Sequence, residues 1–275
     1  MPRSGPTTLA LPPFAGATRK LILISVGVFF AEAVLRLVLP AGIYQFLYAQ
    51  LILLPRDVLH GEIWQLLTYA FLPIGILGTL FAMLTLWFTG SMLEGIRGSR
   101  WVYELFLTSA VAGALMASAI AYTRLFHLDP ASSAGVGPWA AIYGLLIGIA
   151  VLLGDQEFLL LFIVRIKAKY LVAIYVLIDL ATLLKASNTF EALLHLSGAL
   201  SAYMFIRYVP RRGIASGFME RVYALRNDYY RSKRRRTARK FEVYMRAQNR
   251  EVHFDNDGRY IEPEKRDPND KKWMN

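Results

Sequence analysis

The sequence predicts an all-α integral membrane protein, built as a bundle of six transmembrane helices. Of its 275 residues, 55% are hydrophobic, and the mean hydropathy is +0.37. The formal net charge is nevertheless +11, and residues 210–275, with 18 Lys/Arg and 10 Asp/Glu, carry +8 of it. A soluble domain of ordinary composition does not separate apolar and charged residues in this way.

Six apolar runs approach the roughly 20 residues that a helix needs to cross about 30 Å of hydrocarbon. The predicted spans are Leu21–Leu39, Ile74–Met92, Trp101–Thr123, Gly135–Leu153, Tyr170–Leu184 and Thr189–Val209. The fifth span is short, and the stretch Phe158–Val164 before it either extends that helix or lies in the membrane interface. The first span contains Glu32 and Arg36 and lacks a cleavage-site pattern, which argues against a secretory signal peptide.

The chain divides into three regions. Residues 1–19 are rich in Pro, Gly, Ser and Thr, and we expect them to be disordered. Residues 20–210 form the membrane domain. Residues 211–275 form a basic tail that we expect to be helical in part and then, after Glu251, disordered as Pro, Asp and Asn accumulate.

The distribution of Lys and Arg predicts the orientation, because short cytoplasmic loops are enriched in both. With both termini in the cytoplasm, the outer loops hold only Arg56, Arg124 and Lys185. The expected location is therefore the inner (plasma) membrane of a bacterium. In this orientation Pro40–Pro73 is an outer loop, whose amphipathic segments suit the membrane interface. These segments are Leu51–Leu54 and Glu62–Leu72.

Composition also excludes several kinds of chemistry. The chain has no cysteine, and its four histidines have no metal-ligand spacing, so we expect no disulfide, no metal and no cofactor. No RNA-binding motif is visible, which disfavours RNA as a partner, and DNA is not expected. A transporter or channel is disfavoured because charges within the spans are sparse and no pair of broken helices is visible.

Four segments, in order and with suitable spacing over Lys20–Val209, resemble the rhomboid intramembrane serine proteases. Glu62–Leu72 resembles their outer-loop signature, and Trp87 through Arg100 resembles the end of their second helix with the loop that follows. Gly137–Gly144 lies where a rhomboid carries its G-x-S-G serine motif. His195-Leu-Ser-Gly-Ala199 matches the sixth-helix motif that supplies the catalytic histidine. The resemblance implies a rhomboid-like six-helix fold.

The sequence departs from this family at the catalytic residues. Trp139 stands at the serine position, and an indole has no nucleophilic oxygen. Gly78 and Ala82 stand where the family places polar side chains that stabilise the oxyanion, and loss of one such donor costs about 10²–10³ in rate. His195 is kept, and Tyr143 matches the aromatic residue that stacks on it in the family. Gln65 and Pro73 replace an arginine and a histidine that are frequent in the family.

The loss pattern resembles the catalytically dead rhomboids, the iRhoms and Derlins. The resemblance implies a non-catalytic protein that binds transmembrane segments of client proteins, with a pocket formed by Trp139, Tyr143 and His195. The alternative is an active rhomboid serine peptidase with a rearranged site, which would use Ser132, Ser133 or Ser197. We interpret Trp139 as a plug of the former catalytic cavity. His195 and Asp179 are expected to form structural hydrogen bonds within the membrane.

The basic tail is the remaining feature. Phe218, Val222, Leu225 and Tyr229 have helical spacing, and six basic residues follow. One interpretation is a solvated positive-inside tail. The other is an amphipathic helix bound to anionic lipid headgroups, at about 1 kcal/mol for each basic residue near the surface. The predicted lipid-binding residues are Lys233, Arg234, Arg235, Arg236, Arg239 and Lys240.

Overall fold

A computed structural model describes residues 12–160, 164–185, 188–209 and 214–247, together with 252, 254, 255, 259 and 260. Side chains at 157–160, 164–165 and 214–225 lie outside this description. The chain forms two compact units, residues 1–213 and 214–275, and each is described by itself.

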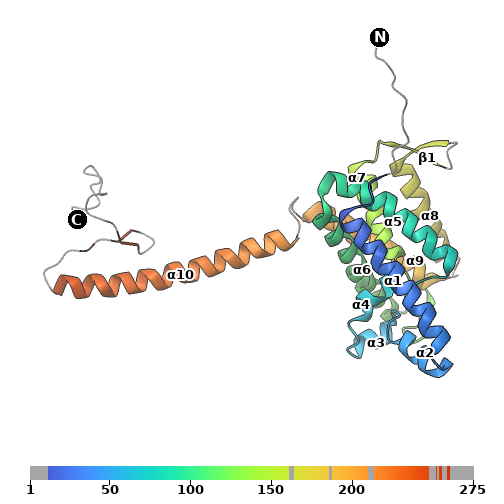
Figure 1. The fold of residues 1–275 in the computed structure, drawn as a ribbon, viewed down its shortest axis with the longest axis horizontal. Coiled ribbons are helices and arrows are strands. Elements are labelled where there is room, and N and C mark those ends of the chain that lie inside the picture. Colours follow the sequence, from blue (N-terminus) through green and yellow to red (C-terminus); the bar gives the residue numbers. More distant parts are fainter. Residues whose placement is uncertain are drawn as a thin grey trace, which may run out of the picture. The chain divides into compact units, whose positions relative to one another are not determined.

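The first unit is a helical bundle with one short β-hairpin (Figure 1). Its elements are, in order, α1 (Gly16–Val38), α2 (Ala41–Ala49), α3 (Pro55–Leu59), α4 (Gln65–Thr68), the 3₁₀ turn η1 (Tyr69–Phe71), α5 (Ile76–Arg97), α6 (Ser99–Tyr122), the 3₁₀ turn η2 (Leu125–His127), α7 (Trp139–Leu152), β1 (Glu157–Leu160), β2 (Val164–Lys167), α8 (Ala168–Leu184) and α9 (Thr189–Tyr208).

Each of the six predicted spans coincides with a helix, and the predicted all-α bundle is confirmed. Within the described residues, α1, α5, α6 and α9 are long and apolar enough to cross a membrane, and α7 is a shorter apolar helix of 14 residues. The largest differences in a boundary are five residues: α1 begins at Gly16 instead of Leu21, and α5 continues past the predicted end at Met92 to Arg97. Gly98 separates α5 from α6. Its φ of +83° is rare for residues with a side chain, which explains why a glycine stands at this position.

Helices α6, α7 and α9 form the centre of the bundle, and small residues let them approach closely. A Cβ atom added to Gly198 on α9 would lie 2.3 Å from the carbonyl oxygen of Ala140 on α7, and one added to Gly113 on α6 would lie 2.8 Å from the Cα atom of Gly198. One added to Gly144 on α7 would lie 2.0 Å from the hydroxyl of Ser109. Helix packing in membranes depends on such close backbone contact rather than on the hydrophobic effect.

Glu94 near the end of α5 holds the start of α1. Its carboxylate accepts hydrogen bonds from the backbone N–H groups of Ala17, at 2.7 Å, and Thr18, at 3.1 Å, and from the Thr18 hydroxyl at 2.8 Å. The first N–H groups of a helix lack partners within the helix, and a carboxylate there also favours the helix dipole. Ser99 at the start of α6 donates to the same carboxylate.

The predicted outer loop is built from short helices. α2, α3 and α4 lie at the end of the bundle opposite the β-hairpin (Figure 1). Leu53 pairs through its backbone with Gly135 just before α7, at 3.0 and 2.9 Å. The loop is thereby fixed to the segment that leads into α7.

The helical interpretation of Phe158–Val164 is wrong for the residues described there, while a position in the membrane interface stays a prediction. β1 and β2 form a two-stranded antiparallel hairpin in which Glu157 pairs with Lys167 and Leu160 with Val164. Asp155 accepts a hydrogen bond from Lys169 at 2.8 Å, and this contact lowers the pKa of the exposed carboxyl. A uniformly apolar run gives no periodicity by which a strand could be distinguished from a helix.

In the second unit, α10 runs from Ile214 to Ala247. The side chains of Phe218, Val222 and Leu225 lie outside the description. Phe254 and Tyr260 form a backbone bridge, and Phe254 packs edge-on against Phe241 of α10 with ring centroids 6.2 Å apart. The few described residues after Glu251 thus include a backbone bridge and a ring contact with α10, and disorder of the stretch stays a prediction.

Candidate functional site

Helices α7, α8 and α9 bring the predicted pocket residues and one further residue together. The Tyr143 ring on α7 stacks on the imidazole of His195 on α9, with centroids 5.1 Å apart and planes at 24°. The Tyr143 hydroxyl donates to the carbonyl oxygen of Tyr175 on α8, at 3.3 Å. This bond fixes the ring in the position that supports His195.

Asp179 on α8 is the further member of the site. Its Oδ2 atom lies 3.2 Å from Nδ1 of His195, and the two side chains are 12% and 18% exposed. An ionised carboxylate accepts a hydrogen bond from Nδ1–H, which leaves Nε2 as the acceptor nitrogen of the ring. The sequence predicted that Asp179 needs a partner but did not identify His195 as that partner. The spacing of residues along a helix does not show how that helix is rotated relative to its neighbour.

Trp139 is the first residue of α7 and lies one turn before Tyr143. Residues four apart share a helix face, so Trp139 lies on the face that carries the ring stacked on His195. The side chain is half-buried and packs against the apolar core. Gly137 two residues earlier has φ +96° and donates its N–H to the Tyr69 carbonyl at 2.9 Å, which fixes the turn into α7.

Gly78 and Ala82 lie one turn apart on α5, and neither offers a side-chain donor. Ala82 is fully buried, and a Cβ at Gly78 would lie 2.9 Å from Ile74. Ile74 also lies against Gly137, so the segment leading into α5 is next to the turn that begins α7. The nearby Thr79 hydroxyl accepts the Ile74 N–H at 3.1 Å and is therefore already hydrogen-bonded.

Among the described residues, none of the serines considered as substitute nucleophiles is hydrogen-bonded to His195. In the part of the chain that the structure describes, the side-chain partners of His195 are Asp179 and Tyr143. Ser133 and Ser197 are buried, and Ser132 bonds Asp129 at 3.5 Å. The described residues also contain no group of three His, Asp or Glu side chains that could hold a metal ion.

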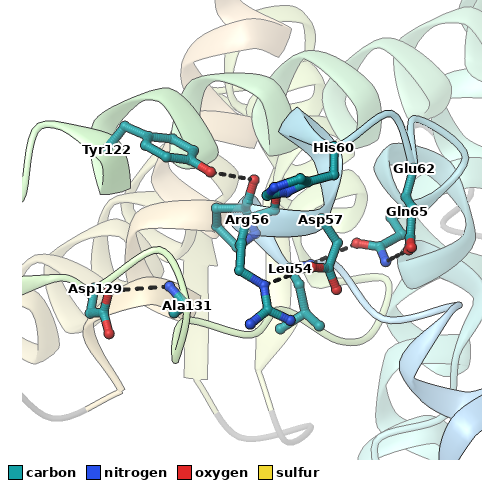
Figure 2. A network of polar contacts seen from close by, with 10 residues as sticks. Leu54, Arg56, Asp57, His60, Glu62, Gln65, Tyr122, Asp129 and Ala131 are labelled. Atoms are coloured by element: carbon teal, nitrogen blue, oxygen red, sulfur yellow. Dashed lines mark hydrogen bonds and ion pairs between the residues drawn. The ribbon is translucent and has the colours of Figure 1, made fainter.

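The outer-loop segment that resembles rhomboids forms hydrogen bonds within its own loop, some of which are drawn in Figure 2. Gln65 is fully buried; its side-chain oxygen accepts the Leu54 N–H at 2.9 Å, and its amide donates to Glu62 at 2.6 Å. The Trp64 indole donates to the Gln50 carbonyl at 2.9 Å, and the Thr68 hydroxyl to that of Leu51 at 2.8 Å. The side chains in this segment thus satisfy backbone groups of the same loop.

The predicted lipid-binding residues lie together on α10 in the second unit. Arg234 is partly buried and donates to the Tyr230 carbonyl at 3.4 Å, and the other five are exposed. These five are Lys233, Arg235, Arg236, Arg239 and Lys240.

Comparison with known proteins identifies a family. Residues 19–229 match the family described as "Eukaryotic integral membrane protein (DUF1751)". Rhomboid-like protein 19 of Arabidopsis thaliana is 30% identical over 161 residues, which cover 54% of this chain and 49% of the relative. The chain thus spans about half the length of this curated relative.

The expected bacterial inner membrane is wrong, because the matching family is eukaryotic and the relative is a plant protein. Lys/Arg asymmetry predicts orientation in a membrane, but it does not distinguish bacterial from eukaryotic membranes. The integral membrane class and the rhomboid-like all-α fold are both supported. The chain belongs to the DUF1751 family of eukaryotic integral membrane proteins, a rhomboid-like family.

Proposed function

We propose that the protein is a non-catalytic, rhomboid-fold membrane protein that binds transmembrane segments of client proteins. One observation carries the proposal. Tyr143 stacks on the imidazole of His195, and Trp139, one turn earlier on α7, stands where the resemblance to rhomboids places the serine.

The chemistry of these groups argues against acyl transfer. A serine peptidase needs a hydroxyl whose proton the histidine can accept and donors for the developing oxyanion. The Trp139 indole N–H is only a donor, and Gly78 and Ala82 supply no side-chain donor. His195 with Asp179 is therefore a base without a nucleophile to activate.

The surfaces beside the site suit a transmembrane segment. Both α5 and α8 pack on α7, and each exposes apolar side chains. On α5 these include Leu77, Leu80, Phe81 and Leu84, and on α8 they include Ile174, Leu177 and Ile178. Association within a bilayer depends on shape and close packing, and these faces offer both aliphatic and aromatic contacts to a client helix.

Site-specific photocrosslinking tests this proposal. A photoreactive amino acid replaces Phe81 on α5 or Leu177 on α8, and the control position is Leu115, an apolar and exposed residue on α6. We expect crosslinks to the same membrane-spanning peptides from positions 81 and 177, and weaker or different crosslinks from position 115. Crosslinks of equal yield and identity from all three positions would contradict a binding face at α5 and α8.

A further inference from the structure

A second polar site lies between α1, α2 and the start of α5, apart from His195 and its neighbours. It is a pocket of about 830 Å³. Its polar lining comes from Glu32 and Arg36 on α1 and from Tyr44, Gln45 and Tyr48 on α2. Its apolar walls include Phe29, Leu39, Pro73 and Ile76.

The two charges of this pocket stand in a defined arrangement. Glu32 and Arg36 are four residues apart on α1, so their Cβ atoms are about 5–6 Å apart on one face. The Tyr44 hydroxyl donates to the Glu32 carboxylate, and the Tyr44 ring stacks on Tyr48 with centroids 5.8 Å apart. Burial first, and then the bond to Glu32, raises the pKa of the Tyr44 phenol to about 12, so the phenol stays a neutral donor.

Arg36 is the group that a ligand would satisfy. The structure gives its exposed guanidinium no hydrogen bond or ion pair within the described residues, although Glu32 lies one turn away. Arg36 lies two residues before the end of α1, which is about 3 Å along the helix axis. Glu32 lies about 9 Å before the same end. These depths correspond to the headgroup and upper acyl region of the leaflet that, by the Lys/Arg distribution, faces away from the cytoplasm.

We infer that this pocket binds the headgroup of a zwitterionic phospholipid that carries a primary ammonium, such as phosphatidylethanolamine. The phosphate pairs with the Arg36 guanidinium, which is suited to planar, bidentate contacts. The ammonium, two carbons away, donates to the Glu32 carboxylate beside Tyr44. The apolar walls receive the upper acyl chains. An anionic headgroup without an ammonium would bring no cation to Glu32. This inference is independent of client binding.

Native mass spectrometry of the full-length protein in detergent tests the inference. The probes are phosphatidylethanolamine, phosphatidylcholine, phosphatidylglycerol and soluble glycerophosphoethanolamine. We expect phosphatidylethanolamine to bind most tightly, and Arg36→Gln and Glu32→Gln each to weaken it about tenfold, the loss of one charge-assisted contact. Binding of glycerophosphoethanolamine with the affinity of the lipid would instead assign the site to a soluble phosphate compound and overturn the lipid.

Matched control variants come from the same end of the bundle. Arg124→Gln follows α6 and Glu191→Gln lies in the first turn of α9, both exposed and both outside the pocket lining. They should leave lipid binding unchanged. Thermal unfolding checks each variant, and Arg36→Gln, at an exposed position, stays decisive if Glu32→Gln unfolds. Equal binding of the three phospholipids, or equal loss in the control variants, would overturn the inference.

Discussion

The Oδ2 atom of Asp179 on α8 lies 3.2 Å from Nδ1 of His195 on α9, inside a bundle of apolar helices. Ionisable groups at this depth are costly unless they are paired. The contact satisfies both residues, fixes which imidazole nitrogen carries the proton, and joins two neighbouring helices. The histidine that a catalytic relative would use for proton transfer is thus held by the carboxylate and by the Tyr143 ring.

A double-mutant cycle measures this contact. Asp179→Ala and His195→Ala should each destabilise the protein, and the double variant should recover a coupling energy of about 0.6–1.7 kcal/mol, the size found for hydrogen bonds between membrane helices. The readout is unfolding in mixed detergent. The control cycle pairs Asp179→Ala with Ser201→Ala, whose hydroxyl bonds the Ser197 carbonyl. A coupling energy near zero in the first cycle would show that the contact has no energetic weight.

The close approach of α7 and α9 predicts a severe effect from a single methyl group. Gly198→Ala places Cβ 2.3 Å from the Ala140 carbonyl oxygen, and we expect a loss of about 1–3 kcal/mol because backbone must move. Gly95→Ala on α5 is the matched control, because no heavy atom lies within 4 Å of its added Cβ. This change should be neutral or stabilising, since alanine favours a helix. Equal melting temperatures for both variants would contradict the packing described here.

Trp139→Ser tests the side chain at the serine position. Removing a fully buried tryptophan costs about 3–5 kcal/mol, and for this half-buried one we expect about 2 kcal/mol. Trp139→Phe, which keeps an aromatic ring, should lose less. The serine variant should remain inactive, because Gly78 and Ala82 still offer no oxyanion donor. Unchanged stability in detergent would mean that Trp139 faces lipid or water and fills no cavity.

We propose that the basic segment of α10 binds anionic headgroups. Replacing Lys233, Arg234, Arg235, Arg236, Arg239 and Lys240 by Gln in the tail unit, residues 214–275, should weaken its flotation with anionic vesicles, by up to about 1 kcal/mol for each residue at the surface. Added salt should weaken wild-type binding in the same way. The control is the double variant Asp228→Asn with Glu242→Gln, which removes negative charge from the same helix and should strengthen binding. If none of these changes alters binding, the interpretation as a solvated tail is the one supported.

The helices were predictable because the length and polarity of a run decide whether it can span a membrane. The span predicted over Thr189–Val209 differs from α9 by one residue at its end. The hairpin of β1 and β2 was not predictable, because its apolar residues show neither helical nor alternating spacing. The hairpin is held by backbone pairing along both strands, from Glu157 with Lys167 to Leu160 with Val164, and a count of hydrophobic residues does not detect such pairing.

The candidate site was predictable in part, and for a different reason. Tyr143 and His195 came from resemblance to a family, and the structure brings the two rings together. Asp179 was placed in mid-membrane without its partner, because helices α8 and α9 can be rotated against each other without changing either sequence pattern. The pocket at Glu32 and Arg36 depends on where α2 folds against α1, and the sequence places both charges on α1 without showing what faces them.

The central claim is that the fold is rhomboid-like and its site is not catalytic. The most direct measurement is a cleavage assay with the purified protein in lipid bilayers and model transmembrane substrates, combined with labelling by serine-reactive fluorophosphonates. We predict no cleavage and no labelling, and no difference between the wild type and His195→Ala, because Trp139 supplies no hydroxyl. Cleavage that is lost in His195→Ala, or labelling that is lost in Ser132→Ala, Ser133→Ala or Ser197→Ala, would contradict the claim.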